Sequence, residues 1–302
     1  MVVGVGAFGR NHARVYKELE QQGEPLRLLG VVDRDVTRAD AVAREFNCRS
    51  FGSLDQLLTT HREVQAASVT VPTVDHLATA RVLMESGVDV MIEKPLATSL
   101  SEADDLVKLA AEKGRLAQVG HLERFNPAVR ATIPLITQPM FFEVHRLSVF
   151  TPRSLDIDVV LDLMIHDLDI VLSFVKSPVE EVRAVGLPIL SGKTDIANVR
   201  IEFASGCVAN FTASRVSTER IRKLRFFQPR QYISIDYARQ DVIVFTVGSD
   251  QGEPSANPEI KIMKPPVQQE EPLRAEIRSF LESVQTRSRA AVPLEDGRRA
   301  SA

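Results

Sequence analysis

Residues 1–16, MVVGVGAFGRNHARVY, decide the fold, because a short apolar run leads there into three regularly spaced glycines. In a GxGxxG turn between a strand and a helix, Gly4, Gly6 and Gly9 allow a tight bend and let backbone N–H groups approach a pyrophosphate at the helix N-terminus. The pair Ala7–Phe8 inside the turn would line the same site. The stretch therefore predicts a dinucleotide-binding Rossmann fold.

Strand-like and helix-like segments alternate from this turn to about residue 120, which is typical of a doubly wound parallel sheet with crossover helices. We expect strands at Val2–Val5, Leu26–Asp33, Ala66–Val71, Asp89–Ile92 and Leu116–Val119. We expect helices at Arg10–Gln21, Thr37–Phe46, Leu54–Thr59, Val74–Ser86 and Ser101–Lys113. Residues 1–120 are therefore predicted to form an NAD-binding Rossmann domain.

After Gly120 the pattern changes to one apolar helix, Asp158–Val175, and then to strands without helices between them, which favours a large, mostly antiparallel sheet. The expected strands are Glu181–Val185, Ala197–Phe203, Val208–Ser214, Lys223–Gln228, Gln231–Asp236 and Asp241–Thr246. A loop over Gln251–Pro272, a helix over Leu273–Val284 and a frayed tail from Gln285 should follow. Residues 121–302 are predicted to form a second α/β domain for substrate binding and oligomerisation, although the length also allows one large domain.

Composition limits the kind of partner. The chain is 44% hydrophobic and 25% charged, which is typical of a globular protein, and its net charge of -3 gives no basic surface for nucleic acid. No run of 18 apolar residues and no signal-peptide pattern occurs, so we expect a cytoplasmic protein outside the membrane. Cys48 and Cys207 have no zinc-type spacing, so neither a disulfide framework nor a metal is expected. A small-molecule partner is the remaining expectation.

Asp33 bears on the choice of cofactor, because it ends the second expected strand. An acid about 20 residues after the glycines can accept hydrogen bonds from both ribose hydroxyls of NAD and would repel a 2′-phosphate. Arg34 and Arg38 follow it and could instead clamp a 2′-phosphate. NAD is therefore the expected cofactor and NADP the alternative.

A lysine follows another expected strand, Asp89–Ile92, in the tripeptide Glu93-Lys94-Pro95. Ligands of a Rossmann sheet bind beyond the carboxyl ends of its strands, so the Lys94 ammonium group would point at the nicotinamide, and Pro95 would fix the backbone beside it. A lysine at a strand end is otherwise usually a solvated surface residue. Lys94 is thus a candidate that needs support from a second element.

The helix Asp158–Val175 supplies that support, since it is apolar nearly all round and should be buried. Its polar residues recur at spacings of four, three and four residues on one stripe, namely Asp162, His166, Asp169 and Ser173. Buried charges are costly unless paired, so the stripe predicts a polar cavity in which Asp162 orients His166 for proton transfer. A salt-bridged seam or a hydrogen-bonded core histidine is the alternative.

The segment Gly120–Pro127, GHLERFNP, enters the second domain from the end of the last Rossmann strand, a position suited to lining a cleft. Candidate substrate contacts are therefore His121, Arg124 and Asn126, with Asp169 from the apolar helix. A histidine at such a place is otherwise a hinge or cap residue. Zinc chemistry with Asp162, His166 and His121 is a further alternative.

Together, GxGxxG, Glu93-Lys94-Pro95 and Asp162-x-x-x-His166 resemble the Gfo/Idh/MocA oxidoreductase family in order and spacing over essentially the whole chain. The resemblance implies a Rossmann domain followed by an open-faced sheet domain, a bound nicotinamide dinucleotide, and oxidation or reduction of a sugar or cyclitol. Lys94 and His166 match the catalytic residues of the family, and Asp162 matches the partner of the histidine. The cofactor-lining segment of the family after the third strand is matched by Val69-Thr70-Val71-Pro72, followed by His76. Glu93, beside Lys94, is a further cofactor-binding candidate.

Three stretches resemble one branch of the family: Gly9–Tyr16, Gly120–Ala128 and Asp162–Asp167. That branch oxidises the 3-hydroxyl of UDP-N-acetylglucosamine to a ketone, which a partner aminotransferase converts to an amine on the route to amide-linked lipid A. The resemblance implies a UDP-sugar substrate, whose diphosphate could be bound by Arg146, Arg153 and Arg215.

Two other functions remain open at this point. One is dehydrogenation of a free sugar or inositol, and the other is dinucleotide sensing without catalysis. A sensor has no need of a proton acceptor, so the presence of both Lys94 and His166 speaks against it. One broad face of the second sheet needs cover, so a homodimer or homotetramer is expected in every case.

Overall fold

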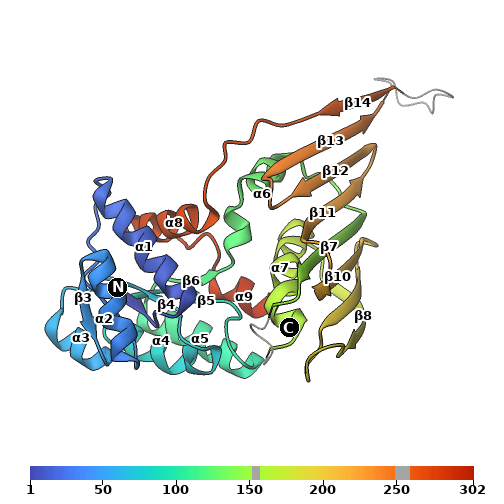
Figure 1. Cartoon of the computed structure of the whole chain (residues 1–302). Helices are drawn as coiled ribbons and strands as arrows, with labels where there is room; N and C mark the ends of the chain where they lie inside the picture. The colour runs from blue at the N-terminus through green and yellow to red at the C-terminus, as the bar shows by residue number, and fades with distance from the viewer. Residues whose placement is uncertain (152–156, 249–258) are drawn as a thin grey trace. The chain divides into compact units, whose positions relative to one another are not determined.

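The computed structural model describes residues 1–151, 157–248 and 259–302. The chain forms two compact units: unit 1 combines Met1–Leu122 with Leu273–Ala302, and unit 2 is Glu123–Pro272 (Figure 1). The first boundary therefore lies close to the predicted residue 120. The second differs from the prediction, because Leu273–Ala302 belongs with the Rossmann unit and not with the second domain. No helix in the described ranges is long and apolar enough to span a membrane.

Unit 1 contains the predicted parallel sheet, with six strands in the order β3-β2-β1-β4-β5-β6. The strands are β1 (Val2–Val3), β2 (Gly30–Val32), β3 (Arg49–Phe51), β4 (Ala66–Val69), β5 (Asp89–Glu93) and β6 (Ala117–Gly120). β3 is an addition to the predicted strands. Order reverses between β1 and β4, which is where a doubly wound sheet binds its ligand.

The longer helices of unit 1 each bury an apolar stripe, and polar caps define several of the helix starts. They are α1 (Ala7–Gln21), α2 (Val36–Phe46), α3 (Leu54–Thr60), the 3-10 turn η1 (Thr73–Asp75), α4 (His76–Glu85), α5 (Leu100–Lys113), α8 (Pro272–Thr286) and α9 (Leu294–Ala300). The Asp35 carboxylate accepts from the Arg38 N–H at the start of α2 (3.1 Å), and the Ser99 hydroxyl accepts from the Glu102 N–H at the start of α5 (3.2 Å).

The C-terminal helix α8 completes the core of unit 1. Its residues Leu273, Ile277 and Phe280 are buried in the same apolar cluster as Tyr16 and Leu19 of α1. Burying each such side chain contributes about 1.5–3 kcal/mol, which explains why this segment returns to the first unit. The predicted frayed tail from Gln285 is wrong in part, because α9 follows and buries its small and apolar residues.

Unit 2 is built on an eight-stranded sheet in the order β14-β13-β12-β11-β7-β10-β9-β8, in which only the β7–β10 pair is parallel. The strands are β7 (Phe141–Val149), β8 (Val179–Leu187), β9 (Ile196–Phe203), β10 (Val208–Ser217), β11 (Ile221–Gln228), β12 (Gln231–Asp236), β13 (Asp241–Val247) and β14 (Ile260–Met263). This confirms the mostly antiparallel sheet. β7, absent from the prediction, occupies a central place in it, and β14 lies in the predicted loop Gln251–Pro272.

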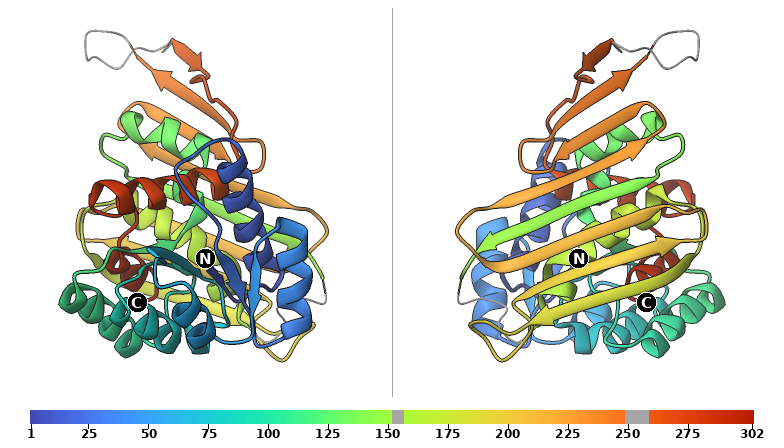
Figure 2. Two further views of the ribbon diagram at one scale, coloured as in Figure 1. Left: turned by 90° about the vertical axis from the view of Figure 1, so that its left-hand side faces the viewer. Right: turned by 90° about the vertical axis from the view of Figure 1, so that its right-hand side faces the viewer.

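The helices of unit 2 lie on one face of this sheet, and the other face is open to view on the right of Figure 2. They are the 3-10 turn η2 (Leu122–Phe125), α6 (Pro127–Thr132), the 3-10 turn η3 (Ile133–Leu135), the π-helical turn η4 (Val160–Met164) and α7 (Ile165–Phe174). Phe174 of α7 packs edge-on to Phe226, which stacks on Phe142. The predicted helix Asp158–Val175 is present, but its first part is a π turn and not α-helix.

Candidate functional site

The glycine-rich turn of unit 1 has the geometry that a dinucleotide needs. Gly4 has φ of +84°, and a Cβ there would lie 2.7 Å from the Val71 nitrogen. A Cβ on Gly9 would overlap the Gly4 carbonyl oxygen, so α1 can approach the turn this closely only without a side chain. A Cβ on Gly6, by contrast, would meet nothing within 4 Å. Gly6 is the N-cap of α1 and faces open space, where a pyrophosphate can reach the helix N-terminus.

The same turn borders a cavity of about 800 Å3 within unit 1. Its lining includes Gly4, Gly6, Ala7, Phe8, Asp33, Arg34, Arg38, Thr70 and Pro72. All of these were named from the sequence, Thr70 and Pro72 through the family resemblance and Arg38 as a possible contact of a 2′-phosphate. The cavity joins the ends of β1, β2 and β4, and the residues present fit an elongated dinucleotide.

Asp33 follows β2, and its carboxylate is oriented by the protein. Oδ2 accepts from the Val5 N–H (2.8 Å), and Oδ1 accepts from the Asp35 N–H (2.9 Å). The Arg38 guanidinium lies 3.4 Å from Oδ2, whereas Arg34 is turned toward Asp75 at 3.3 Å. Of the two arginines that could contact a 2′-phosphate, Arg38 is thus the one beside the acid.

The segments that follow β4 and β5 are connected by a buried histidine. The Thr70 hydroxyl donates to the Gly4 carbonyl (2.5 Å), which joins the glycine turn to the end of β4. The His76 ring nitrogens lie 3.0 Å from the Val71 carbonyl and 3.2 Å from the Leu96 carbonyl. Burial lowers the pKa of His76, which favours the neutral imidazole. His76 therefore holds the two segments together from beneath.

Glu93 belongs to a buried polar cluster beside Lys94. Its carboxylate lies 3.1 Å from His12 Nε2 and accepts from the Lys94 backbone N–H (3.3 Å). The other His12 ring nitrogen is 3.0 Å from the Ser68 hydroxyl, which is 2.9 Å from the Tyr16 hydroxyl. Because both carboxylate and imidazole are buried with partners, they fix the backbone from which the half-buried Lys94 side chain extends.

The end of β6 supports the same carboxylate. A Cβ on Gly120 would lie 2.5 Å from Glu93 Oε1, so a side chain here would displace this carboxylate. His121 follows and is buried in unit 1. No group of three His, Cys, Asp or Glu side chains within residues 1–151, 157–248 and 259–302 is arranged to hold a metal ion.

In unit 2, α7 carries a buried acid that the sequence reasoning did not single out. Asp167 accepts two hydrogen bonds from Arg146 of β7, from Nε at 2.6 Å and from Nη2 at 3.0 Å. The third nitrogen of Arg146 donates to Glu123 (3.2 Å), and the guanidinium lies 5.1 Å from the centre of the Tyr237 ring. Burial raises the pKa of Asp167, and the positive charge of Arg146 opposes the rise. Asn126 donates to Glu123 (3.1 Å) and N-caps α6.

A second fork holds the next acid of α7. Arg124 donates to both oxygens of Asp169, at 2.6 and 2.8 Å. Ser173 donates to the Ile170 carbonyl of its own helix (2.7 Å). Of the predicted polar stripe, Asp169 and Ser173 thus have their partners inside unit 2, while Asp162 and His166 are half-buried on η4 and α7. Two arginine forks fix the helix on which His166 lies.

The arginines considered for a diphosphate have different surroundings. Arg146 and Arg215 are buried and paired with acids of unit 2, Arg215 with Asp195 at 2.8 Å. Their donors are therefore used within the protein, which is a reason to look elsewhere for a diphosphate contact. Arg153 lies outside the described residues. Arg222 of β11 was not considered from the sequence; it is exposed, and it lies directly opposite Arg146 on the neighbouring strand.

Sequence reasoning missed Glu123, Asp167 and Arg146 as one buried cluster, although a signal existed. Asp167 is an acid in an apolar helix, so by the argument applied to Asp162 it requires a partner. On β7, Arg146 lies on the same face of the strand as buried Phe142 and Val144, so it too points into the core. Because a buried charge needs a partner of opposite charge, an acid and an arginine that are both expected to be buried in one domain are expected to pair.

The glycine turn, the acid after β2 and the polar strand ends of a parallel sheet define an oxidoreductase that binds a nicotinamide dinucleotide. Residues 1–121 match the model of the oxidoreductase family with an NAD-binding Rossmann fold, and residues 140–232 match the Gfo/Idh/MocA C-terminal domain. The chain belongs to the Gfo/Idh/MocA oxidoreductase family, whose dehydrogenases act on CH–OH groups.

Several relatives carry the name of a specific activity. The chain is 38% identical to UDP-N-acetylglucosamine 3-dehydrogenase of Acidithiobacillus ferrooxidans over 284 residues, which are 94% of this chain and 87% of that protein. A solved structure of that enzyme superimposes with a TM-score of 0.89 over 99% of this chain and 92% of the other, at 36% identity. Inositol 2-dehydrogenase of Rubrobacter xylanophilus is 30% identical over 72% of this chain and 64% of that protein.

Proposed function

We propose that this protein oxidises the 3-hydroxyl of UDP-N-acetylglucosamine to the 3-keto sugar with NAD as the hydride acceptor. The observation that carries the proposal is 38% identity, over 94% of the chain, to an enzyme named for that reaction. Identity at this level extends through both units and is not confined to the shared Rossmann half. Lys94 and the Asp162/His166 pair, which a dehydrogenase needs and a dinucleotide sensor does not, are both present.

The chemistry divides between the cofactor and the protein. The nicotinamide, when bound, accepts the hydride from the sugar carbon. The hydroxyl proton must pass to a base, and an imidazole is suited to this near neutral pH. We assign the base to His166, on the helix that the two arginine forks hold, with Asp162 orienting it. Lys94, extending from the backbone that Glu93 fixes, polarises the hydroxyl or relays its proton, and the two roles could be exchanged.

Single substitutions test these roles. Lys94→Ala and His166→Ala should each lower kcat by about 100-fold or more, because general acid–base groups contribute about 100- to 10,000-fold. The affinity for NAD, measured by isothermal titration calorimetry, should stay nearly unchanged. Asp162→Ala should cost less, since it orients the ring and does not react. Wild-type rates in both alanine variants would refute the assignment.

The substrate is tested by comparing four compounds. NADH formation is followed with UDP-N-acetylglucosamine, UDP-glucose, free N-acetylglucosamine and inositol at equal concentrations. A preference for the first compound supports the proposal. The second candidate is inositol dehydrogenation, which the 30% identity to an inositol 2-dehydrogenase favours, and faster turnover of inositol would establish it instead.

NAD is proposed over NADP on the geometry of Asp33. Its carboxylate is held by two backbone N–H groups at the end of β2, so a 2′-phosphate would meet a fixed negative charge. Asp33→Ser should relax the preference and leave Arg38 to attract the phosphate. Tighter binding of NADP than of NAD by the wild-type protein would refute this assignment.

For the substrate diphosphate we propose Arg222. It lies opposite Arg146 on the helix-bearing side of the sheet, and no ion pair of its guanidinium occurs among the described residues. Asp167 and Glu123 pair with Arg146, whereas the guanidinium of Arg222 is exposed and can bind a diphosphate through charge-assisted hydrogen bonds. Arg222→Gln should raise KM for UDP-N-acetylglucosamine and leave KM for NAD unchanged. An unchanged KM for the sugar nucleotide would remove Arg222 from the site.

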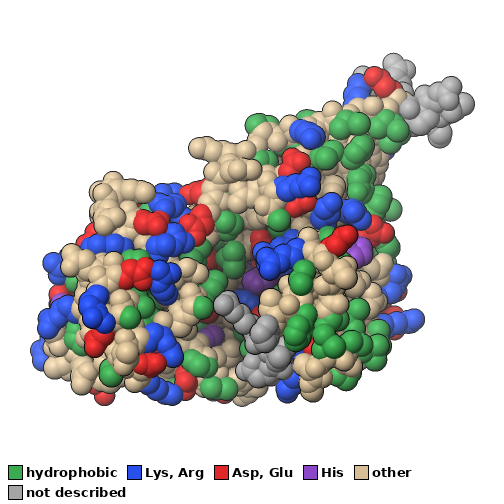
Figure 3. All heavy atoms as spheres, in the orientation of Figure 1, with side chains coloured by type: hydrophobic (Ala, Val, Ile, Leu, Met, Phe, Trp, Pro, Cys, Tyr) green, Lys and Arg blue, Asp and Glu red, His purple; other side chains and the backbone are tan. Residues whose placement is uncertain are grey.

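A homo-oligomer is proposed through the open face of the unit 2 sheet. Phe141, Phe227, Tyr232 and Phe245 form a continuous aromatic row on that face, with ring centres 4.9–6.1 Å apart. Figure 3 shows hydrophobic side chains gathered around β13 and β14 as well. Surfaces of this kind are seldom left to water. Light scattering should give at least a dimer for the wild type and a smaller species for Phe227→Glu.

We further propose that the enzyme works in the cytoplasm and that an aminotransferase consumes its ketone on the way to amide-linked lipid A. The support is the same 38% identity. Adding an aminotransferase and glutamate to the reaction should drive NADH formation forward and yield an amino sugar detectable by mass spectrometry.

A further inference from the structure

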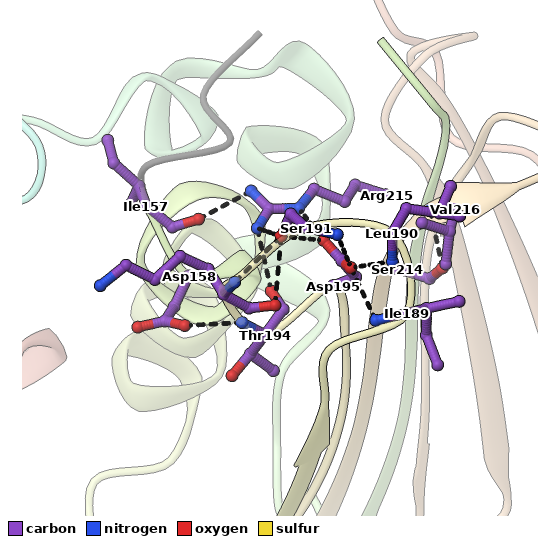
Figure 4. Close-up of polar contacts among 11 residues, drawn as sticks. Ile157, Asp158, Ile189, Leu190, Ser191, Thr194, Asp195, Ser214, Arg215 and Val216 are labelled. Carbon is purple, nitrogen blue, oxygen red and sulfur yellow. Dashed lines mark hydrogen bonds and ion pairs between the residues drawn. The ribbon is translucent and has the colours of Figure 1, made fainter. Parts of the chain in front are cut away.

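A buried ion pair in unit 2, Arg215 with Asp195, lies at the centre of a dense network (Figure 4). Asp195 Oδ2 accepts from three successive backbone N–H groups, those of Ile189, Leu190 and Ser191, at 2.6–2.8 Å. Its Oδ1 accepts from the Ser191 hydroxyl (2.6 Å) and from Arg215 Nε (2.8 Å). Burial alone would raise the pKa of Asp195, but these hydrogen bonds hold it well below its usual range. The carboxylate is therefore a fixed anion that orients Arg215.

The remaining donors of Arg215 reach the residues at which the helix η4–α7 begins. Nη1 donates to the Ile157 carbonyl (2.7 Å), and Nη2 donates to the Thr194 carbonyl (3.2 Å). Thr194 in turn contacts the helix start twice: its carbonyl accepts from the Val159 N–H (3.0 Å), and its N–H donates to the Asp158 carboxylate (2.9 Å). The start of the helix is thus attached to the β8–β9 connection, and Arg215 holds both.

A single hydrogen bond connects this helix start to Asp162: the Asp162 N–H donates to the Asp158 carbonyl (3.0 Å). Asp162 itself lies in the π turn Val160–Met164, which leads into α7 with His166 and in which the Ile165 N–H donates to the Val160 carbonyl. π turns are rare, occur frequently at functional sites, and are among the features that kink a helix. The angle between Asp162 and His166 therefore depends on where the helix start is held.

We propose that Arg215 and Asp195 are positioning residues for proton transfer: by fixing Ile157–Val159 they set the orientation of Asp162 toward His166. The inference rests on the proposed function, in which His166 is the base. A displacement of about 1 Å by a change remote from the reacting atoms can lower the rate by about 100-fold. Loss of the Arg215 contacts should therefore lower kcat by about 10- to 100-fold and leave KM for NAD unchanged.

The experiment compares three substitutions with one control. Arg215→Met removes every donor, Arg215→Lys retains the charge and reach to Asp195, and Asp158→Ala removes only the contact to Thr194. The control is Gln228→Leu in the last residue of β11, because buried Gln228 also loses hydrogen bonds, to the Thr137 N–H and the Leu135 carbonyl. For each variant kcat, both KM values and Tm are measured.

A second readout does not require turnover. Protein labelled on its six histidines gives separate imidazole NMR signals, of which that of His166 is identified with His166→Gln. Support for the proposal is a shifted His166 signal and a reduced kcat in Arg215→Met and Asp158→Ala, partial recovery in Arg215→Lys, and neither change in Gln228→Leu. A kcat loss no greater than in Gln228→Leu, with an unmoved His166 signal, overturns it. If Arg215→Met does not fold, Arg215→Lys and Asp158→Ala decide by the same criteria. If the wild type forms no NADH from UDP-N-acetylglucosamine, the proposed substrate fails, and the His166 signal alone decides the positioning role.

Discussion

Replacing Arg146 with Met should destabilise unit 2 strongly, because its guanidinium pairs with two buried acids, Asp167 and Glu123. The side chains of Arg146, Asp167 and Glu123 are 4%, 2% and 7% exposed. The variant loses three hydrogen bonds of 2.6–3.2 Å and leaves two carboxylates without this counter-charge. Breaking one buried pair costs about 3–5 kcal/mol, which we take as the expected loss in free energy of unfolding.

Thermal and urea unfolding near pH 7 measure this loss. A change of 1 kcal/mol shifts Tm by about 2–4 °C for domains of 150–250 residues, so Tm should fall by about 6–20 °C. The penalty should shrink on acidification: burial already raises the pKa of Asp167, and without Arg146 the carboxyl takes up a proton more readily still. The variant should therefore lose most stability at neutral pH and recover toward pH 4.

The control is Arg200→Met, which breaks an exposed pair with Glu202 (3.1 Å) on β9 of the same unit. Exposed pairs contribute about 0–1 kcal/mol, so this variant should unfold almost like the wild type. A loss below about 1 kcal/mol in Arg146→Met as well would show that the acids of unit 2 do not depend on Arg146, and the reasoning from burial would be refuted.

Four further substitutions test other parts of the structure. Gly9→Ala should prevent NAD binding, since the new Cβ overlaps the Gly4 carbonyl, whereas Gly6→Ala should fold normally and bind NAD more weakly; equal NAD titrations for the two would contradict the turn geometry. Folding lowers the pKa of Asp195, so this carboxylate stabilises the protein at pH values above its ordinary pKa of 3.8 and the stabilisation is lost as the pH falls below that value. Tm of Asp195→Asn should therefore depend less on pH between 5 and about 2.5 than Tm of the wild type does. Phe280→Ala should cost about 3–5 kcal/mol in the unfolding of unit 1, and a change confined to unit 2 would contradict the placement of α8.

Much of unit 1 was predictable because its signals are local. The glycines, the acid after β2 and the alternation of apolar strands with amphipathic helices all lie within short windows of sequence. β3 was missed because it is three residues long and buries only Phe51. The helix α9 was missed because its buried positions include Gly297 and Ala300, which make no apolar stripe.

Unit 2 was harder, because its features depend on distant residues. β7 alternates correctly, but Arg146 stands at a position that faces the core, and the partners that make it acceptable lie on η2 and α7. The spacing of apolar residues predicts a helix at Val160–Met164 but does not predict its hydrogen-bond pattern, so it could not reveal the π turn. The amphipathic pattern of α8 predicts that one face of the helix packs against a core, but it does not predict which of the two units provides that core.

The return of α8 to unit 1 has a consequence for synthesis. Unit 2 is continuous in sequence, from Glu123 to Pro272, so it can fold as soon as that segment has left the ribosome. The Rossmann unit must wait, with the apolar surface around Tyr16 and Leu19 uncovered, until Leu273–Phe280 emerges. The first part of the chain to be made is therefore the last to mature, and a nascent chain stalled before α8 would carry a complete unit 2 and a Rossmann unit whose apolar core is still open.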